Sequence, residues 1–465
     1  MSSFQVRSGG AFLRPLPTAA IPKSIAGAAV FAVLAIVLLA WTSWNMGSNL
    51  EINRNESWNA WFIDAVLKGT PLYPSRDELI VNNYPPLSFY ITALVAKLAG
   101  DTIFAGRLLS LISAFAVSAA AGFSLRALGA SRGVAALGAF WLLATLVQFF
   151  RRYVGVNDPS LLGLAIMGFA LAYFLNCLKS GRAVEPAVAC MVFAGFVKHN
   201  MPAIPLAALL WLAMTNRRSG IRAILFGAAL CVAGLYLCTA VFGPNFAEQM
   251  LMPREITFRH ILTTINKLQW IAPALLIWAI WAWPNRRDPA VRFIALLLGL
   301  SLASGVFQAA GAGVSFNAYL EVTFASAIAI ALAFEGISKT AFARRFGTDL
   351  TQTAIIAVLV LRVLMSQQLE PYLFLVSPAF RAEIRQAEAI TVSEIARIRS
   401  IPGPVSCSEL LVCYRAGKAF VYDPFWANGR AALSPDFKPA QIALSRGIRF
   451  EAIDLRGYRE KKRLF

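Results

Sequence analysis

The stretch that decides the fold follows the first long apolar run, where residues 51–86 read EINRNESWNAWFIDAVLKGTPLYPSRDELIVNNYPP. It carries acids at Glu51, Glu56 and Asp64, followed by turns rich in proline and glycine. Such a loop could be a simple connector between membrane spans. Acids that come directly after a span, however, lie at the membrane surface, where a lipid-borne substrate presents its head group. We therefore expect this loop to contribute to a functional site.

An amphipathic helix is expected inside this loop. Trp58 and Trp61 recur at helical spacing, and their indole rings suit the head-group depth of a bilayer. Gly69 can end the helix because it tolerates the left-handed conformation of a C-cap. The pair Pro85 and Pro86 fixes an extended entry into the next apolar segment. Membrane anchoring alone would explain the same pattern, so both roles stay open.

The composition is that of a protein that crosses a membrane many times. Of the 465 residues, 58% are hydrophobic and 14% charged, and the mean hydropathy is +0.62. Soluble domains have about 45–50% apolar and about 25% charged residues. The formal charge of +19 would suggest nucleic acid in a soluble protein. Here Lys and Arg gather in short loops between apolar runs, which the positive-inside bias explains, so we expect no nucleic-acid partner.

Apolar runs of the length needed for a membrane span, about 17–25 residues, occur throughout the chain. They lie at residues 24–44, 105–127, 133–150, 159–178, 184–199, 200–216, 221–243, 268–284, 290–310, 316–336 and 351–369. The segment 86–99 is also apolar, but it is short. Whether this segment spans the membrane decides the sidedness of everything after it.

Charge decides the topology. If residues 86–99 stay on the outer side, every short inner loop is basic, as the positive-inside rule requires. The basic residues of these loops are Arg126, Arg132, Lys179, Arg182, Arg217, Arg218, Arg222, Arg286, Arg287, Arg292, Lys339, Arg344 and Arg345. We therefore expect about eleven transmembrane helices, with the N-terminus inside and the C-terminus outside. The parts would be a cytoplasmic tail at 1–23, a membrane domain at 24–369 with its first outer loop at 45–104, and a periplasmic domain at 370–465.

The last part of the chain predicts a small α/β domain, because the apolar runs stop and the charge density rises. We expect an amphipathic helix over 380–398, strands at 404–407, 419–422 and 448–454, a helix at 439–446, and a solvated basic end at 459–463. In this topology Cys407 and Cys413 face an oxidising compartment, which allows a disulfide. Geometry could still forbid the bond, so the pairing stays open.

Ionisable residues gather at the outer ends of the expected spans. They are Arg107, Lys198, Glu321 and Arg362. Ionisable groups inside spans are costly and by default mark a functional site. Snorkelling of each side chain to the interface is the alternative.

The order of several short motifs resembles the GT-C superfamily of integral-membrane glycosyltransferases. The motifs are Asn55-Glu56, Leu67-Lys68-Gly69-Thr70-Pro71-Leu72-Tyr73, Tyr84-Pro85-Pro86-Leu87, Gly106-Arg107-Leu108, Arg151-Arg152-Tyr153, Asn157-Asp158-Pro159, Lys198-His199-Asn200 and Asn317-Ala318-Tyr319-Leu320-Glu321. The likeness covers nearly the full chain and is greatest to bacterial enzymes related to protein O-mannosyltransferases and the lipid A aminoarabinose transferase. Many relatives have an Asp-Glu pair where this chain has Asn55-Glu56. The resemblance therefore makes Glu56 the catalytic candidate of this pair, with Glu51 as its substitute.

The resemblance implies a transferase that moves a sugar from a polyprenyl phosphate or pyrophosphate carrier to a glycan, lipid or protein acceptor. It also implies that the protein lies in the bacterial inner (cytoplasmic) membrane and acts at its outer face. A carboxylate must accept the acceptor's proton, and cations must stabilise the departing phosphate. Glu56 and Asp158 are the expected catalytic carboxylates. Because Asp158 precedes Pro159, an N-cap of the next helix is the alternative for it. A divalent cation between the two acids also stays an alternative.

The expected phosphate ligands are Lys198 and the pair Arg151 and Arg152. The two arginines could instead cap the C-terminus of a helix. Asn317 and Glu321 are four residues apart and share a helix face, where they would bind sugar hydroxyls or clamp two helices together. The further residues expected to bind substrate are Tyr84, His199 and Glu51.

Two other classes of protein fit the composition. A transporter or lipid flippase of envelope glycan synthesis would also cross the membrane many times, but its site usually lies at the midplane between internal repeats. This sequence has no half-to-half repeat, and its unusual charges lie outward. A non-catalytic scaffold is the other alternative, and it predicts that replacing Glu56 and Asp158 by alanine leaves function intact.

Overall fold

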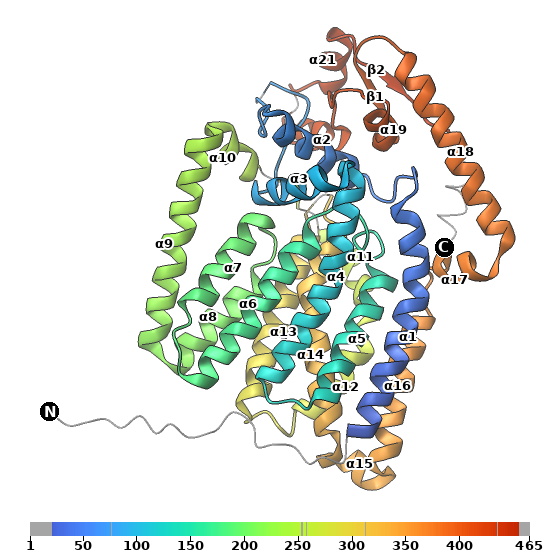
Figure 1. Ribbon diagram of the computed structural model, residues 1–465. Helices are drawn as coiled ribbons and strands as arrows, with labels where there is room; N and C mark the ends of the chain where they lie inside the picture. Colours follow the sequence, from blue (N-terminus) through green and yellow to red (C-terminus); the bar gives the residue numbers. More distant parts are fainter. Residues whose placement is uncertain are drawn as a thin grey trace.

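The apolar runs fold into helices because the interior of a bilayer offers no water to backbone N–H and C=O groups. The computed structural model describes residues 21–75, 77–252, 254–256, 258–311, 313–434 and 436–454. A bundle of long helices carries smaller helices and a two-stranded sheet at one end (Figure 1). Residues 1–20 of the expected tail and the basic end at 459–463 lie outside the described residues.

Each expected span coincides with a helix. These helices are α1 (Ile21–Met46), α4 (Thr102–Ala127), α5 (Arg132–Phe149), α6 (Ser160–Ser180), α7 (Glu185–Val197), α8 (Ala203–Thr215), α9 (Arg217–Phe242), α12 (Ala272–Ala282), α13 (Pro289–Ala309), α14 (Leu320–Gly336) and α16 (Thr348–Leu364). Among the described residues, 7 helices are long and apolar enough to cross a membrane by themselves. Shorter connecting helices are α10 (Pro244–Met250), α11 (Phe258–Ile265), η2 (Asn266–Trp270), η3 (Phe316–Tyr319), η4 (Ile337–Lys339) and α15 (Ala341–Phe346).

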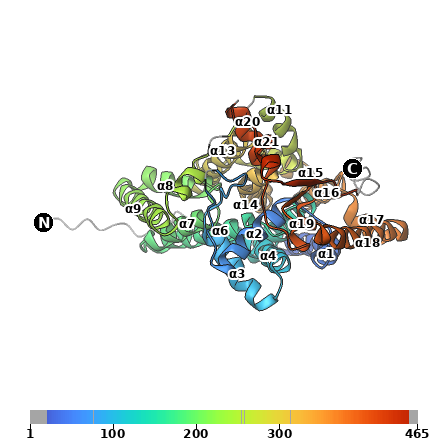
Figure 2. The ribbon, with the colours of Figure 1, turned by 90° about the horizontal axis from the view of Figure 1, so that it is seen from above.

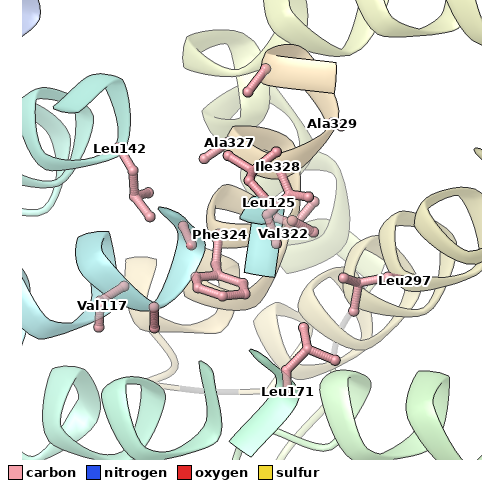
Figure 3. Close-up of a cluster of buried hydrophobic side chains, with 14 of the residues drawn as sticks. Val117, Leu125, Leu142, Leu171, Leu297, Val322, Phe324, Ala327, Ile328 and Ala329 are labelled. Atoms are coloured by element: carbon pink, nitrogen blue, oxygen red, sulfur yellow. The ribbon is translucent and has the colours of Figure 1, made fainter. Parts of the chain in front are cut away.

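Helix α14 is the centre of the bundle. All its side chains are buried, and it packs against α4, α5, α12 and α13. Figure 3 shows Phe324 and Ile328 of α14 among apolar side chains of the surrounding helices. Helix α9, by contrast, exposes most of its side chains, as a lipid-facing helix does. The outer end of α14 is therefore held on several sides, and Asn317 and Glu321 are held with it.

Two helices of the first outer loop lie across the end of the bundle, as predicted. They are α2 (Asn55–Lys68) and α3 (Leu87–Ala99), which pack against each other (Figure 1). The C-cap of α2 is Gly69, whose φ of 68° is in the left-handed region. The segment 86–99 thus lies across one end of the bundle rather than in the row of parallel helices (Figure 1).

The tryptophans of α2 pack against other parts of the protein, which their spacing did not predict. Trp58 is buried and packs edge-on against Phe62, with ring centroids 4.7 Å apart. Trp61 stacks on Phe420 at 4.6 Å and donates a hydrogen bond to the Lys418 carbonyl at 3.0 Å. The C-terminal residues cover the face of α2 that would otherwise meet lipid head groups.

The C-terminal part is a small α/β domain, as predicted. Its elements are α17 (Glu370–Val376), α18 (Pro378–Ser400), β1 (Val405–Cys407), α19 (Leu410–Arg415), α20 (Pro424–Leu433), α21 (Pro439–Ser445) and β2 (Arg449–Glu451). The two strands pair in parallel, with Val405 opposite Arg449. Helix α18 is the expected amphipathic helix and buries Ile384 and Ile398. Cys407 and Cys413 form a disulfide.

The strand predicted at 419–422 is wrong, because this segment pairs with the first outer loop instead of with the sheet. The backbone N–H of Asp423 donates to the Leu79 carbonyl at 2.8 Å. Leu79 is fully buried in a cluster with Tyr422 and Trp426. An extended segment of apolar residues predicts a strand, but its pattern does not reveal a partner so far away in the sequence.

Helix α19 fastens the C-terminal domain to the same loop. The backbone N–H of Leu411 donates to the Glu51 carboxylate at 2.9 Å, and the Tyr414 hydroxyl bonds to Asp64 at 3.2 Å. Arg415, at the end of α19, forms an ion pair with Asp101. Figure 2 shows α19 beside α2, which agrees with their direct packing. The loop between α1 and α4 is therefore enclosed between the bundle and the C-terminal domain.

Candidate active site

Glu56 and Arg107 form a buried ion pair beneath the first outer loop. Both side chains are fully buried, and the guanidinium binds the two carboxylate oxygens at 2.7 Å and 3.0 Å. The other donors of Arg107 bind backbone carbonyls within residues 45–50. Glu56 also accepts the backbone N–H of Ile52 at 3.0 Å. The pair joins the outer end of α1 to the start of α2, and it leaves the Glu56 carboxylate no exposed surface.

Asp158 lies next to this ion pair, in the loop between α5 and α6, and is 4% exposed. One carboxylate oxygen accepts the Ser160 N–H at 2.9 Å, which is the helix-start role expected of an Asp-Pro turn. Among the described residues, its other oxygen accepts a long bond of 3.4 Å from Asn55. Asn157 binds Glu56 through both its backbone N–H and its side-chain amide. The two expected acids are therefore neighbours, and Asp158 keeps free accepting capacity.

Two glycines allow the helices to approach the site closely. A Cβ on Gly106 of α4 would lie 1.9 Å from Oδ1 of Asn157. A Cβ on Gly163 of α6 would lie 2.7 Å from Cβ of Lys198. A side chain at either position would push the loop or the lysine away from Asp158.

Lys198 follows α7 and is 2% exposed. Its ammonium lies 3.1 Å from the ring centroid of Tyr84, a cation–π contact. In the described part of the chain it forms no ion pair, although Asp158 is near enough to act on its charge. Burial, followed by the charge of Asp158, raises the pKa of Tyr84 well above its usual value. The phenol therefore stays neutral, and the lysine rests on its ring.

The two adjacent arginines have different surroundings. Arg151 forms an ion pair with Glu370 at the start of α17, so its charge is already compensated. Arg152 is exposed, and its backbone carbonyl accepts the Asn53 amide at 3.0 Å. Of the two, Arg152 is better able to meet an anion.

Glu321 and Asn317 have separate roles. The Glu321 carboxylate is 3% exposed and accepts the first two backbone N–H groups of α8, at 3.1 Å and 2.9 Å. It is the interhelical clamp that the sequence allows. Asn317 accepts a hydrogen bond from the Tyr153 hydroxyl at 3.3 Å. Burial, followed by the charge of Asp158, raises the pKa of Tyr153. Tyr153 therefore lies near Asp158, and its hydroxyl connects Asn317 to the site.

The remaining expected residues lie at the edge of the site or away from it. Glu51 lies under α19 and accepts the Leu411 N–H. His199 is exposed beside Lys198. Arg362 donates to the Gln269 carbonyl at 3.1 Å.

Asn59 belongs to the site although the sequence pattern does not single it out. Tyr153, which stands in one of the quoted motifs but has no role assigned from the sequence, also belongs to the site. Asn59 is 1% exposed and donates a hydrogen bond of 2.7 Å to the Asn157 carbonyl. It follows Glu56 by three residues, a spacing that puts both on one face of α2. That spacing is the signal that could have identified it.

The donor set does not suit a divalent cation between Glu56 and Asp158. Arg107 occupies both oxygens of Glu56, which leaves Asp158 as the available carboxylate. Within the described ranges, no three His, Cys, Asp or Glu side chains gather in a way that could hold a metal ion.

Comparison with solved structures identifies the fold. No family model matches the sequence, and no curated protein matches it either. ArnT from Cupriavidus metallidurans bound to undecaprenyl phosphate is similar with a TM-score of 0.54 and 14% identity, over 88% of this chain and 88% of that chain. The same protein in the apo state gives a TM-score of 0.48 and 16% identity, over 84% and 74%. This chain therefore has an ArnT-like fold.

Proposed function

We propose that this protein transfers a sugar from a polyprenyl-phosphate carrier to an acceptor hydroxyl at the outer face of the membrane. The observation that carries the proposal is the pair Asp158 and Lys198. Both are buried at the same end of the bundle, Asp158 is near enough to act on the charge of Lys198, and the two form no ion pair. The ArnT-like fold supports it, and the similar ArnT structure holds undecaprenyl phosphate.

The proposed chemistry needs one base and one cation. The acceptor oxygen attacks the anomeric carbon, its proton passes to Asp158, and the bond from that carbon to the carrier phosphate breaks. A positioned carboxylate contributes roughly 10²–10⁴-fold to such a step. The phosphate leaves with the electron pair of the broken bond, and the Lys198 ammonium stabilises its charge.

Glu56 is assigned a different role from Asp158. A base needs a lone pair that can reach the substrate proton, and the Glu56 oxygens are occupied by Arg107 and the Ile52 N–H. Its contacts with Asn157 instead hold the residue that precedes Asp158. In this proposal Glu56 is a positioning residue, and Asp158 is the base.

The end of the bundle that carries Asp158 is assigned to the outer side. Helices α2 and α3 and the C-terminal domain occupy this end (Figure 1). The opposite end carries the basic loops, which the positive-inside rule places in the cytoplasm. The N-terminus would then be cytoplasmic and the C-terminal domain periplasmic.

Reconstitution tests the proposal. Purified protein in liposomes is given undecaprenyl-phosphate sugars, and consumption of the donor is measured for wild type and for Asp158→Asn. The control is Asp288→Asn, because Asp288 begins α13 with the same Asp-Pro turn and caps that helix through Ala290. We expect transfer by wild type and by the control, a large loss in Asp158→Asn, and no effect of a chelator. Solute uptake without donor consumption would instead favour a transporter.

A further inference from the structure

Residues 45–52, at the end of α1 and just beyond it, carry the backbone groups that hold the buried ion pair. Their carbonyls accept hydrogen bonds of between 2.7 Å and 3.2 Å from the Arg107 guanidinium, at Asn45, Met46, Ser48 and Leu50. The backbone N–H of Ile52 donates to the Glu56 carboxylate at 3.0 Å. The conformation of this segment therefore decides where Arg107 and Glu56 lie.

Helix α18 of the C-terminal domain binds the same segment. The backbone N–H of Asn49 donates to Oε1 of Glu388 at 3.1 Å, although the two residues are 339 positions apart in the sequence. Asn49 directly precedes Leu50, whose carbonyl binds Arg107. Leu50 also lies in one buried cluster with Ile384 of α18, and Figure 2 shows α18 next to α1. Glu388 is therefore fixed against the segment by the packing around it.

The contacts continue from this segment to Asp158. Arg107 binds Glu56, and both side chains are fully buried. The backbone N–H of Asn157 donates to the Glu56 carboxylate at 3.4 Å, and the Asn157 side-chain amide donates to the Glu56 carbonyl at 3.0 Å. Protein interiors are close-packed and transmit strain. A shift of residues 45–52 would therefore reach Asn157 and, with it, Asp158.

Lys198 is held by other elements. It follows α7, and its ammonium rests on the ring of Tyr84. Its Cβ lies against α6, where a Cβ on Gly163 would be 2.7 Å away. A displacement of residues 45–52 should therefore act on the proposed base more than on the cation.

We infer that Glu388 is a positioning residue for Asp158. It holds Asn49 in place, and the segment around Asn49 holds Arg107 and Glu56. The C-terminal domain is then part of the active centre through a hydrogen bond to the backbone. This inference rests on the proposed function for the role of Asp158, and its geometry can be tested without turnover.

Replacement of Glu388 tests the inference in the reconstituted transfer assay. Glu388→Ala removes the acceptor of the Asn49 N–H, and kcat should fall about tenfold, because a misplacement of about 1 Å can cost about 10²-fold. The KM for the donor should not change, since Lys198 is held elsewhere. Glu388→Gln keeps an acceptor oxygen and should restore most of the wild-type kcat. Glu388→Met keeps the length of the side chain without the oxygens, so it provides the same test if Glu388→Ala does not fold.

The matched control is Gln386→Ala, at an exposed position of the same helix. It changes α18 without touching the bond to Asn49, so kcat should equal that of wild type.

Hydrogen–deuterium exchange measures the geometry without turnover. In Glu388→Ala and Glu388→Met, the backbone N–H groups of Asn49, Ile52 and Asn157 should exchange faster than in wild type. The first of them loses its acceptor, and the other two report on Glu56. Glu388→Gln and the control variant should exchange as wild type does.

Faster exchange at Asn49 alone would overturn the inference, because the disturbance would then stop before Glu56. Equal loss of kcat in Glu388→Gln and Glu388→Ala, or an unchanged kcat in both Glu388→Ala and Glu388→Met, would overturn it too. Absence of transfer by wild type overturns the proposed function instead. Exchange at Ile52 and Asn157 then still decides whether Glu388 positions this part of the chain.

Discussion

Two buried pairs of opposite charge lie side by side at the end of the bundle that carries α2 and α3, and they differ in how far each charge is satisfied. Glu56 and Arg107 bind each other through two hydrogen bonds, and backbone groups occupy their remaining positions. Asp158 and Lys198 are also buried, at 4% and 2% exposure, but form no ion pair with each other. The lysine rests on the ring of Tyr84 instead.

Under the proposed function, this difference separates a structural pair from a catalytic one. Burial of a charge costs several kcal/mol unless a partner compensates it. In the Glu56–Arg107 pair the protein supplies that compensation, so the pair stabilises the fold. In the Asp158–Lys198 pair much of the cost is left uncompensated, and a ligand with a hydroxyl and a phosphate can supply it.

The largest effect is expected for Arg107→Ala. The substitution leaves Glu56 charged and buried and deprives several carbonyls of their donor, which should cost about 3–5 kcal/mol. Thermal unfolding in detergent measures the loss. The control is Arg222→Ala, which removes a solvent-exposed partner of Glu185 and should cost less than about 1 kcal/mol. Equal shifts for the two variants would contradict the structural role of Arg107.

Asp158→Asn should separate activity from stability. Asparagine can still accept the Ser160 N–H, so the melting temperature should change little. It cannot take a proton, so kcat should fall by roughly 10²–10⁴-fold. Parallel measurements of kcat and melting temperature check this. A variant that is unstable and inactive together would place Asp158 in the same class as Glu56.

Lys198→Met should give effects of opposite sign on stability and binding. Lys198 is a buried ammonium without an ion pair, and folding must pay for removing its charge from water. Methionine has no charge to desolvate, so the substitution should raise the melting temperature. Loss of a charge-assisted bond to phosphate should weaken donor binding by about 1.5–3 kcal/mol, which appears in the KM for the donor. A lower melting temperature would show that the Tyr84 contact, rather than a ligand, is the role of this lysine.

The smallest effect is expected from a third buried acid, Asp423, which caps α20 and lies near Arg54 and Trp58. Burial raises the pKa of Asp423 above its usual value. The folded protein therefore holds this proton more tightly than the unfolded chain. The resulting contribution of Asp423 to the free energy of unfolding is complete below the ordinary pKa of an aspartate, and it is lost as the pH rises through the pKa of Asp423 in the folded protein. Asparagine resembles the protonated acid and can accept the same two backbone N–H groups. The melting temperatures of wild type and Asp423→Asn should therefore be similar in acid, and at neutral pH the variant should melt higher than wild type. A variant that melts lower at neutral pH than in acid, relative to wild type, would contradict this.

Apolar runs predict the bundle well because a span must satisfy its own backbone. Charge in the loops also places 86–99 correctly, at the end of the bundle. The pairing of Glu56 with Arg107 is different, because a carboxylate and a guanidinium 51 residues apart have many other partners available in the sequence. For the same reason Trp61 is read as a membrane anchor, although Phe420 covers it. Local pattern gives the elements, and tertiary contact decides which charges are left unsatisfied.

The enclosure of the first outer loop by the C-terminal domain has a consequence for biogenesis. A ribosome delivers Leu79 and Val81 early, but their apolar partners Tyr422 and Trp426 arrive almost last. While the intervening helices are inserted, Leu79 and Val81 would therefore lack the apolar contacts that Tyr422 and Trp426 supply in the folded protein. A chain that ended before the C-terminal domain would leave these apolar residues exposed to proteases and chaperones. The first outer loop would then reach its final packing only after the whole chain has been synthesised.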